Sequence, residues 1–456
     1  MRVLVVGLAT TGASVVAYTR AAGHEVTVLD DAPGTSDAAV ARFDAARAAG
    51  AVVVLRPEAA DSAARGRAAD LVVPSPGVHP DHPALVAAHA AGVPVRSEID
   101  LAASRLRARP DHPRLAAVTG TNGKTTVTTL IDAILREAGV RSVAAGNIGR
   151  PLLDAAGDDV DVVVAEVSSF QLAFTTDAFA PDVAVLLNVA EDHLDWHGSA
   201  DAYARAKAEL FRHQGARGLL VVNRNDPVAF RLAADAPGHV VTFGTGTPEP
   251  GGYGVIGDDL VGRAGVLAAR PSGAPHDAAN ALAAAAAALE LGADVDAVER
   301  ALTSFVGLAH RVQLVGEHGG VRYYDDSKAT NPHATAGALA GFDRVVLIAG
   351  GRNKDLDLGV LRVHADRLRA VVAIGEAADE VEAAFRDAVP VTRASSMHDA
   401  VVAAMEHAEP GDAVLLSPAC ASFDWYASYA DRGDDFAREV ASLVPTTECR
   451  NAGGAP

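Results

Sequence analysis

Short runs of aliphatic residues, each closed by glycine, proline or polar residues, recur along this chain of 456 residues. Runs of this length between turn residues are typical of buried β-strands. The strands predicted in this way are Val3–Val6, Glu25–Leu29, Leu71–Val73, Leu115–Thr119, Val162–Ala165, Val183–Leu187, Leu219–Val222, Val345–Ala349, Val371–Ile374 and Ala413–Leu416.

Segments with helical spacing of apolar residues lie between many of these runs. Helices are predicted at 12–22, 127–135 and 201–211, and an alanine-rich helix begins near Asp277, a candidate N-cap. Strands that alternate with helices predict an α/β fold with mostly parallel sheets.

Length and pattern together predict three domains. They are an N-terminal Rossmann-like domain at 1–102, a central domain with a P-loop ATPase-like parallel sheet at 103–308, and a C-terminal Rossmann-like α/β domain at 309–456.

A glycine-rich loop follows the predicted strand Leu115–Thr119 and leads directly into a helix. In that context backbone N–H groups and a helix N-terminus cradle phosphates. Lys124 would reach the β- and γ-phosphates, and the Thr125 hydroxyl would bind Mg²⁺. Val118 stands where strict Walker spacing has glycine, so the loop is a variant; the alternative is an ordinary βα turn. The loop residues are Gly120, Thr121, Asn122, Gly123, Lys124, Thr125 and Thr126.

A carboxylate and an imidazole follow two further strands of the same region. Glu166 comes directly after one strand, and His193 lies in the segment that leaves the next. In open parallel sheets ligands collect beyond the carboxyl ends of strands. This pair suits a divalent metal, although either residue alone is more often structural. Lys207, in a predicted helix, has the pattern of an ordinary exposed lysine.

The N-terminal domain opens with a degenerate dinucleotide fingerprint. Gly7 and Gly12 are present, but the middle glycine is missing, which makes the evidence for NAD weak. A nucleotide diphosphate at the same helix N-terminus is at least as plausible. Ser75 lies in a stiff loop at a strand end, where it could contact a ligand or simply form a turn.

Polar segments follow three strands of the C-terminal domain. The segments are 325–332, 350–355 and 417–424, and they are rich in Lys, Ser and Thr. Such side chains suit a ligand that carries carboxylates. Helix caps and loop solubility would explain each segment singly, but not all three together.

Composition excludes some classes of partner. The 39 basic and 58 acidic residues leave a net charge of −19, which argues against general binding of nucleic acid or of an anionic membrane. Cys420 and Cys449 are too few for a disulfide scaffold, so we expect a reducing compartment. Arg2 and the apolar residues after it form a compact strand and turn rather than a signal peptide, and we expect a cytoplasmic protein.

The motifs taken together resemble the Mur ligase family of ATP-dependent amide-bond ligases. TGTNGKTT alone would indicate only the wider family, which includes folylpolyglutamate synthetase. EVSSFQ, DDSKATNP and LLSPACASFD indicate the branch that adds glutamate to UDP-N-acetylmuramoyl-L-alanine. The motifs are TGTNGKTT (119–126), GNIG (146–149), EVSSFQ (166–171), NVAEDHLD (188–195), HDAANALAA (276–284), HR (310–311), DDSKATNP (325–332) and LLSPACASFD (415–424).

The resemblance implies roles for individual residues. Lys124 and its loop would bind the ATP phosphates, Thr125 and Glu166 a first Mg²⁺, and His193 a second Mg²⁺ together with Lys207, which carries a carbamate in this family. The adenine and ribose side of ATP would meet Asn280, Arg311 and Asp326. The UDP-sugar would meet Thr11, Gly12, Asp30, Ser75 and Asn147. The incoming glutamate would meet Lys328, Thr330, Lys354, Ser422, Phe423 and Tyr429.

Some positions depart from the family pattern. Asp355 stands where glycine is common, Asp277 where asparagine is often found, and Tyr429 where phenylalanine is more usual. Two of the three, Asp355 and Tyr429, lie near the expected glutamate site, so that site is the one most affected.

The implied reaction begins with transfer of the γ-phosphoryl group of ATP to the L-alanyl carboxylate. The amine of glutamate then attacks the acyl phosphate, and the third domain is expected to close through a hinge near 305–311. D-glutamate is favoured by the resemblance alone. Three alternatives stay open: a related ligase using L-glutamate or another amino acid, an NAD-linked oxidoreductase, and a non-catalytic nucleotide-binding protein. A monomer is the default expectation.

Overall fold

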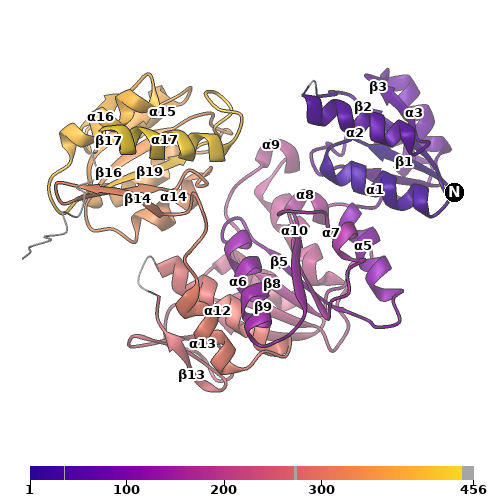
Figure 1. Ribbon diagram of the computed structural model, residues 1–456, viewed down its shortest axis with the longest axis horizontal. Helices are drawn as coiled ribbons and strands as arrows, with labels where there is room; N and C mark the ends of the chain where they lie inside the picture. Colours follow the sequence, from indigo (N-terminus) through magenta and orange to yellow (C-terminus); the bar gives the residue numbers. More distant parts are fainter. Residues whose placement is uncertain (35, 272–274, 444–456) are drawn as a thin grey trace, which may run out of the picture. The chain divides into compact units, whose positions relative to one another are not determined.

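The computed structural model describes residues 1–34, 36–271 and 275–443 (Figure 1). These residues form two compact units. The first unit comprises Met1–Val189, Trp196–Pro271 and Ala278–Phe305. The second comprises Ala190–Asp195, the described residues of 272–277, and the chain from Val306 onward. Cys449, used in the compositional argument, lies outside the described residues. Within the described chain no helix is both long and apolar enough to cross a membrane.

The predicted α/β class with mostly parallel sheets is confirmed. The N-terminal sheet has the strand order β3-β2-β1-β4, and every pair is parallel. Helix α5 continues across residue 102. The elements are β1 Arg2–Val6, α1 Thr10–Ala21, β2 Glu25–Asp30, α2 Asp37–Ala48, β3 Val52–Leu55, α3 Ala59–Ala68, β4 Leu71–Pro74, α4 Pro83–Ala90 and α5 Glu98–Arg107.

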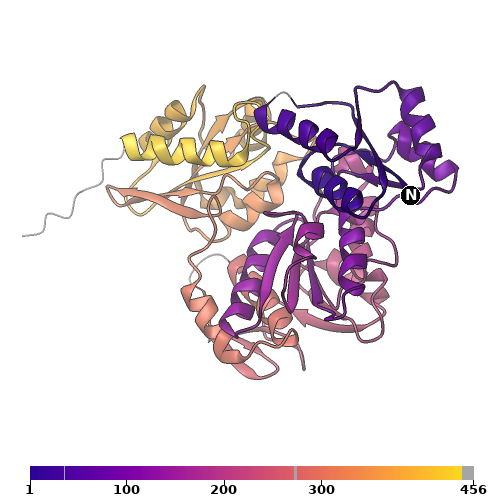
Figure 2. The ribbon, with the colours of Figure 1, turned by 45° about the vertical axis from the view of Figure 1, so that its right-hand side comes forward.

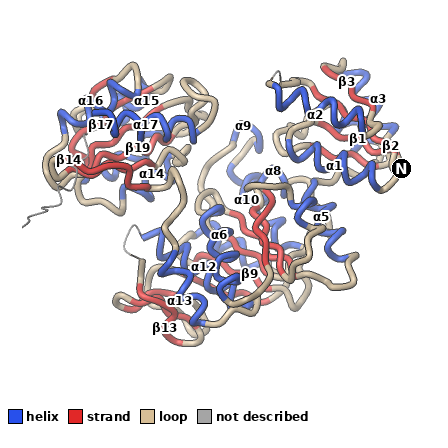
Figure 3. Tube along the Cα trace, in the orientation of Figure 1, coloured by secondary structure: helices blue, strands red, loops and turns tan. Residues whose placement is uncertain are grey.

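The central sheet of the first unit has the order β10-β9-β8-β5-β7-β6 and is wholly parallel. Its four inner strands, β9, β8, β5 and β7, are buried along nearly their whole length, because helices cover both faces (Figure 3). The elements are β5 Arg114–Thr119, α6 Lys124–Glu137, β6 Ser142–Gly146, α7 Leu152–Ala155, β7 Val162–Glu166, α8 Ser169–Leu172, β8 Val183–Leu186, α9 Leu194–His197, α10 Ala200–Arg212, β9 Leu219–Asn223, α11 Pro227–Leu232 and β10 His239–Phe243.

A small antiparallel sheet and two helices complete the first unit. The strands β11 Gly254–Ile256, β12 Asp259–Gly262 and β13 Gly265–Ala269 were not predicted from the sequence pattern. Helix α12 (Pro275–Glu290) starts two residues before Asp277, so the predicted N-cap at Asp277 is wrong. Helix α13 (Val295–Ser304) packs beside α6 (Figures 1 and 2).

The second unit is built on the strand order β14-β15-β19-β16-β17-β18. Only the edge strand β14 is antiparallel to its neighbour. The chain passes from the first unit to the second at Phe305–Val306, and His310 and Val312 then adopt positive φ angles of 59° and 47°. The elements are β14 Gln313–His318, β15 Val321–Asp325, α14 Pro332–Leu339, β16 Val345–Gly350, β17 Leu368–Ile374, α15 Ala378–Phe385, β18 Val391–Arg393, α16 Met397–His407, β19 Ala413–Ala419 and α17 Tyr429–Leu443.

One acidic side chain is buried within the first unit. Glu98, at the start of α5, is 1% exposed, and its Oε1 accepts a hydrogen bond of 2.5 Å from the Leu153 backbone N–H in α7. Its Oε2 finds no partner among the described residues. Burial, with a smaller contribution from the charge of Asp154, raises the pKa of Glu98 to about 7.

This raised pKa predicts a pH-dependent stability. Between pH 4.5, the ordinary pKa of a glutamate, and about 7, the folded protein keeps a proton that the unfolded chain has released. The stability of wild type relative to Glu98→Gln should therefore fall as pH rises through this window, by at most about 1.4 kcal/mol per pH unit. Thermal midpoints of both proteins between pH 5 and pH 8 test this, and parallel curves would contradict it.

Candidate active site

The glycine-rich loop joins β5 to α6 in the way the sequence predicts. Gly123, the N-cap of α6, has φ +85°, and a Cβ there would lie 2.7 Å from Asn280 Oδ1. Only glycine fits this conformation and this close approach. Lys124 Nζ donates to the carbonyl oxygens of Gly120 at 2.8 Å and Thr121 at 2.9 Å, which holds the ammonium group over the loop.

Asn188, two residues after the end of β8, fixes the shape of the loop. Its Oδ1 accepts from the Asn122 N–H at 2.8 Å, its Nδ2 donates to the Asn122 carbonyl at 3.1 Å, and its own carbonyl accepts from the Thr121 N–H at 3.0 Å. The sequence reasoning did not single out Asn188. Its place at the head of NVAEDHLD, directly after a strand, is the signal that could have found it.

Glu166 ends β7 and is 2% exposed. Asn147 Nδ2 donates to Glu166 Oε1 at 2.8 Å, and the Asn147 backbone N–H donates to the Glu166 carbonyl at 2.8 Å. Glu166 Oε2 is buried and has no hydrogen-bond partner among the described residues. A buried carboxylate oxygen is costly to leave unpaired, and a hard cation would satisfy it.

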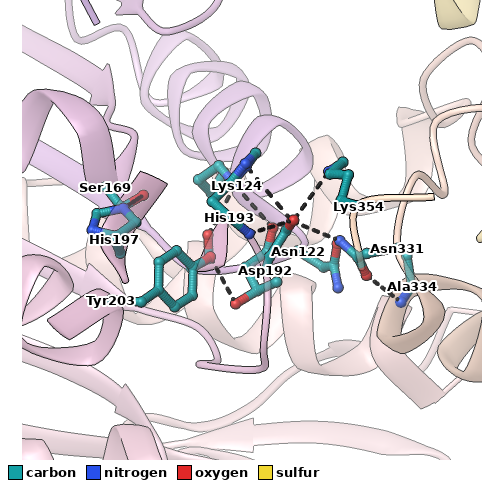
Figure 4. Close-up of polar contacts among 12 residues, drawn as sticks. Asn122, Lys124, Ser169, Asp192, His193, His197, Tyr203, Asn331, Ala334 and Lys354 are labelled. Atoms are coloured by element: carbon teal, nitrogen blue, oxygen red, sulfur yellow. Dashed lines mark hydrogen bonds and ion pairs between the residues drawn. The ribbon is translucent and has the colours of Figure 1, made fainter. Parts of the chain in front are cut away.

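Lys207 lies on α10 and is 1% exposed, so the pattern-based expectation of an exposed lysine is wrong. Its Nζ donates to the Gly120 carbonyl at 2.8 Å and lies 4.5 Å from the centre of the Tyr203 ring. Tyr203 in turn places its hydroxyl 3.1 Å from Thr121 Oγ1 (Figure 4 shows Tyr203). The face of α10 that carries Tyr203 and Lys207 therefore packs against the phosphate loop, and burial follows from that packing.

These groups meet because β5, β7 and β8 are neighbours in the sheet. Parallel strands bring their carboxyl ends to one edge, so the loop, Glu166 and Asn188 converge there. Thr125 follows Lys124 in the first turn of α6 and is half-buried. Asn280, on the second turn of α12, is 9% exposed and lies against Gly123.

The residues fit a magnesium ion that is bound jointly with a nucleotide. Among the described residues no three His, Cys, Asp or Glu side chains form a group that could hold a metal by themselves. Mg²⁺ usually takes only one or two carboxylates and completes its shell with phosphate oxygens and water. Glu166 Oε2 and the Thr125 hydroxyl would be the protein's ligands in the first unit. His193 belongs to the second unit.

The predicted residues of the N-terminal domain also meet at a sheet edge. Asp30 Oδ2 accepts from the Leu8 N–H at 2.8 Å, and Ser75 Oγ donates to the Gly7 carbonyl at 2.8 Å. A Cβ at Gly12 would lie 2.1 Å from the Gly7 carbonyl, so α1 passes directly over the end of β1. Thr11 lies in the first turn of α1 and is half-buried. The strand order changes direction between β1 and β4, the place where open sheets bind ligands.

The second unit gathers its predicted residues at the ends of three neighbouring strands, β15, β19 and β16. Lys328 Nζ lies 3.7 Å from the centre of the Tyr429 ring, a cation–π contact. Ser422 is buried, whereas Phe423 is 63% exposed. Thr330 and Lys354 are half-buried. Lysine and hydroxyl groups are thus collected at this edge.

Asp326 and Arg311, expected near the ribose and adenine, lie at the start of the second unit. Asp326 is buried, accepts from Ser417 Oγ at 2.7 Å and from the Val312 N–H at 3.3 Å, and its burial raises its pKa to about 7. In this structure its carboxylate therefore joins the segment after Arg311 to the end of β19.

Arg432, on α17, is a buried cation that the sequence reasoning missed. Its guanidinium donates to Ser327 Oγ and the Ser327 carbonyl, both at 2.9 Å, and to the Cys420 carbonyl at 3.1 Å. Burial lowers its pKa to about 10. It ties the loops after β15 and β19 together, but an arginine at helical spacing looks like a surface residue in the sequence.

Family models match three consecutive parts of the chain. The Mur ligase MurD-like N-terminal domain matches residues 1–97, the Mur ligase middle domain 118–288, and the Mur ligase glutamate ligase domain 310–420.

Curated relatives and solved structures agree with these matches. The UDP-N-acetylmuramoylalanine–D-glutamate ligase of Frankia casuarinae is 46% identical over 96% of this chain and 93% of its own, and that of Desulfosudis oleivorans is 42% identical over 97% and 96%. The UDP-N-acetylmuramate–alanine ligase MurC of Thermotoga maritima shares the fold, with a TM-score of 0.58 and 19% identity over 97% of this chain and 100% of that one. A pseudomurein peptide ligase of Methanothermus fervidus gives a TM-score of 0.57 at 18% identity, over 91% and 96%. At this identity to curated ligases over nearly the whole chain, the protein belongs to the Mur ligase family.

Proposed function

We propose that this protein is an ATP-dependent ligase that joins UDP-N-acetylmuramoyl-L-alanine to D-glutamate in the synthesis of peptidoglycan precursors. The observation that carries the proposal is the edge of the central sheet, where the phosphate loop, Lys124, Lys207 and the half-bonded carboxylate of Glu166 converge. The curated relatives that share this chain's sequence are named for that reaction.

The loop would hold ATP by its phosphates. Backbone N–H groups at the start of α6 and the Lys124 ammonium would bind the β- and γ-phosphates, and ATP would displace the bonds that Lys124 now makes to its own loop. When bound, Mg²⁺ would offset the charge of the transferring phosphoryl group. Asn147 would keep Glu166 Oε2 turned toward that ion, because it holds Oε1 from the other side.

Lys207 would complete a second metal position after reaction with carbon dioxide. Carbamylation would form a bond between the lysine nitrogen and the carbon of carbon dioxide and release a proton. The product is an anionic carbamate close to Gly120, which with His193 would supply oxygen and nitrogen ligands. This step would turn the buried Lys207 into a metal ligand.

The chemistry proceeds in two bond exchanges. A carboxylate oxygen of the L-alanyl group bonds to the γ-phosphorus as the bond to the β-phosphate oxygen breaks, which yields ADP and an acyl phosphate. The glutamate amine then attacks the acyl carbon, loses its proton, and releases inorganic phosphate. Water would hydrolyse the acyl phosphate, so the second unit is expected to close over the site through the segment near 305–311.

The two other sheet edges would bind the remaining substrates. The ends of β1, β2 and β4 would hold the UDP-sugar through Thr11, Gly12, Asp30 and Ser75, with the diphosphate at the N-terminus of α1. Asn147, after β6, would also face the UDP-sugar. In the second unit, Lys328, Thr330, Lys354, Ser422, Phe423 and Tyr429 would surround glutamate, whose two carboxylates suit lysine and hydroxyl donors. We further propose a cytoplasmic monomer, in keeping with two cysteines and a charge of −19.

The first prediction from the proposed function is the substrate requirement. Purified protein with Mg²⁺ and ATP should release ADP and phosphate only when UDP-N-acetylmuramoyl-L-alanine and D-glutamate are both present. L-glutamate and other amino acids are tested in parallel. L-glutamate carries the same functional groups as D-glutamate in the opposite configuration, and the alternative ligase would use it or another amino acid. Turnover with L-glutamate but not with D-glutamate would support a ligase and show that its amino-acid substrate is L-glutamate. Folded protein that binds ATP but stays inactive with every pair would refute the function.

The second prediction concerns Glu166. Glu166→Gln keeps the size of the side chain and removes its negative charge, so it should lower kcat by about 100-fold or more and raise the Mg²⁺ concentration needed for half-maximal rate. Glu137→Gln, which removes an exposed partner of Arg300 on the same helix as Lys124, is the matched control and should change neither value. An unchanged Mg²⁺ requirement in Glu166→Gln would show that Glu166 is no metal ligand.

The third prediction concerns Lys207. Lys207→Ala should abolish turnover, and short carboxylic acids added to the assay should restore part of it because they can occupy the place of the carbamate. Lys207→Arg keeps a positive charge but forms no carbamate, so it should stay inactive. A fully active Lys207→Arg would show that a cation, rather than a carbamate, is what the reaction needs.

A further inference from the structure

The carboxylate of Asp192 is bound on both of its oxygens within the second unit (Figure 4). Oδ1 accepts hydrogen bonds from Lys354 Nζ at 3.0 Å, with which it forms an ion pair, and from the His193 backbone N–H at 2.9 Å. Oδ2 accepts a hydrogen bond of 3.1 Å from Asn331 Nδ2 and lies 3.7 Å from His193 Nε2. Asp192 and Asn331 are both buried. The three residues come from segments far apart in sequence: Asp192 is next to His193, Asn331 is next to Thr330, and Lys354 is itself one of the proposed glutamate-binding residues.

Asn331 is held rigidly from its other end. It is the N-cap of α14, and its Oδ1 accepts from the Ala334 N–H at 2.9 Å. Turning the amide would break this cap, which is worth on the order of 1 kcal/mol. The Nδ2 group is therefore fixed in the direction of Asp192, and a continuous set of contacts runs from the backbone of α14 to the ammonium of Lys354.

Lys354 is the flexible member of the set. Its side chain has many rotamers and is 20% exposed, so without a partner its ammonium would occupy many positions. Its backbone is fixed, because the Lys354 N–H donates to Asn353 Oδ1 at 2.7 Å. The bond to Asp192 uses one of the three donors of the ammonium group and leaves two for a ligand.

We infer that Asp192 is a positioning residue that holds Lys354 Nζ in place for a carboxylate of the incoming amino acid, and that Asn331 fixes Asp192 for this task. The inference rests on the proposed function, in which Lys354 binds glutamate. The ion pair of Lys354 with Asp192 has no net charge. It therefore contributes to glutamate binding by orienting the two remaining N–H donors of Lys354, rather than by attracting the anionic glutamate through net charge.

Kinetic constants for each substrate separate this role from a general structural one. Asp192→Asn keeps the shape and removes the charge that holds Lys354, so the KM for D-glutamate should rise by about ten-fold. The KM values for ATP and for the UDP-sugar, and the Mg²⁺ dependence, should not change. Asn331→Ser keeps an oxygen that can cap α14 but removes the Nδ2 group that donates to Asp192, and should raise the KM for D-glutamate by a smaller factor.

A double-mutant cycle tests whether Asp192 acts through Lys354. In the background of Lys354→Gln, adding Asp192→Asn should leave the KM for D-glutamate unchanged, because the group that Asp192 positions is gone. The matched control is Glu376→Gln, which breaks the Arg352–Glu376 pair of 2.8 Å two residues from Lys354. Both of those side chains are about half exposed, so this variant should behave as wild type.

Several results would overturn the inference. A shifted Mg²⁺ dependence would show that Asp192 acts through its neighbour His193. An equal rise in every KM would show that Asp192 acts through folding. A further ten-fold rise in the Lys354→Gln background would show that Asp192 does not act through Lys354. Wild-type turnover with D-glutamate, together with an unchanged KM in Asp192→Asn, would refute this inference alone. No wild-type turnover with D-glutamate would refute the proposed function as well.

Discussion

Parallel strands deliver their carboxyl ends to one edge of a sheet, and the three candidate sites of this chain depend on that constraint. In the central sheet β5 lies between β7 and β8, so the loop after β5 meets Glu166 on one side and Asn188 on the other. The same rule collects Gly7, Asp30 and Ser75 in the N-terminal sheet. In the second unit it brings together the loops after β15, β16 and β19. Hydrophobic burial holds the sheets together, and the polar ends of the strands are left to bind ligands.

The order of the strands brings these loops close together, and hydrogen bonds from polar side chains then hold the loops in place. Asn188 makes three hydrogen bonds to the phosphate loop, Asn147 makes two to Glu166, and Arg432 joins the loops after β15 and β19. Asp192 does the same for Lys354. Such preorganisation matters for a reaction in which positioning and electrostatics supply most of the rate. The unpaired Oε2 of Glu166, at the sheet edge that carries the phosphate loop, is the feature that the proposed magnesium ion would explain.

The sequence predicted those parts of the molecule that one local pattern specifies. Apolar runs gave most of the long parallel strands, and the spacing of Gly120, Gly123 and Lys124 gave the phosphate loop. Glu166 could be chosen because it directly follows a strand. Strands β11 to β13 were missed because each is only three to five residues long and includes a glycine. Their pairing depends on the neighbouring strands rather than on a pattern within each strand. The burial of Lys207 and Arg432 was missed because it arises from packing between elements, which neither residue's own surroundings in the sequence reveal.

The central claim is that the phosphate loop directs the γ-phosphoryl group of ATP to a carboxylate of the acceptor, and the fate of that carboxylate's oxygen tests it most directly. UDP-N-acetylmuramoyl-L-alanine would be labelled with ¹⁸O in the L-alanyl carboxylate and converted in the presence of ATP and D-glutamate. Mass spectrometry of the released phosphate should find one labelled oxygen per product molecule, because the acyl phosphate breaks between carbon and oxygen. Amide product accompanied by unlabelled phosphate would contradict the account.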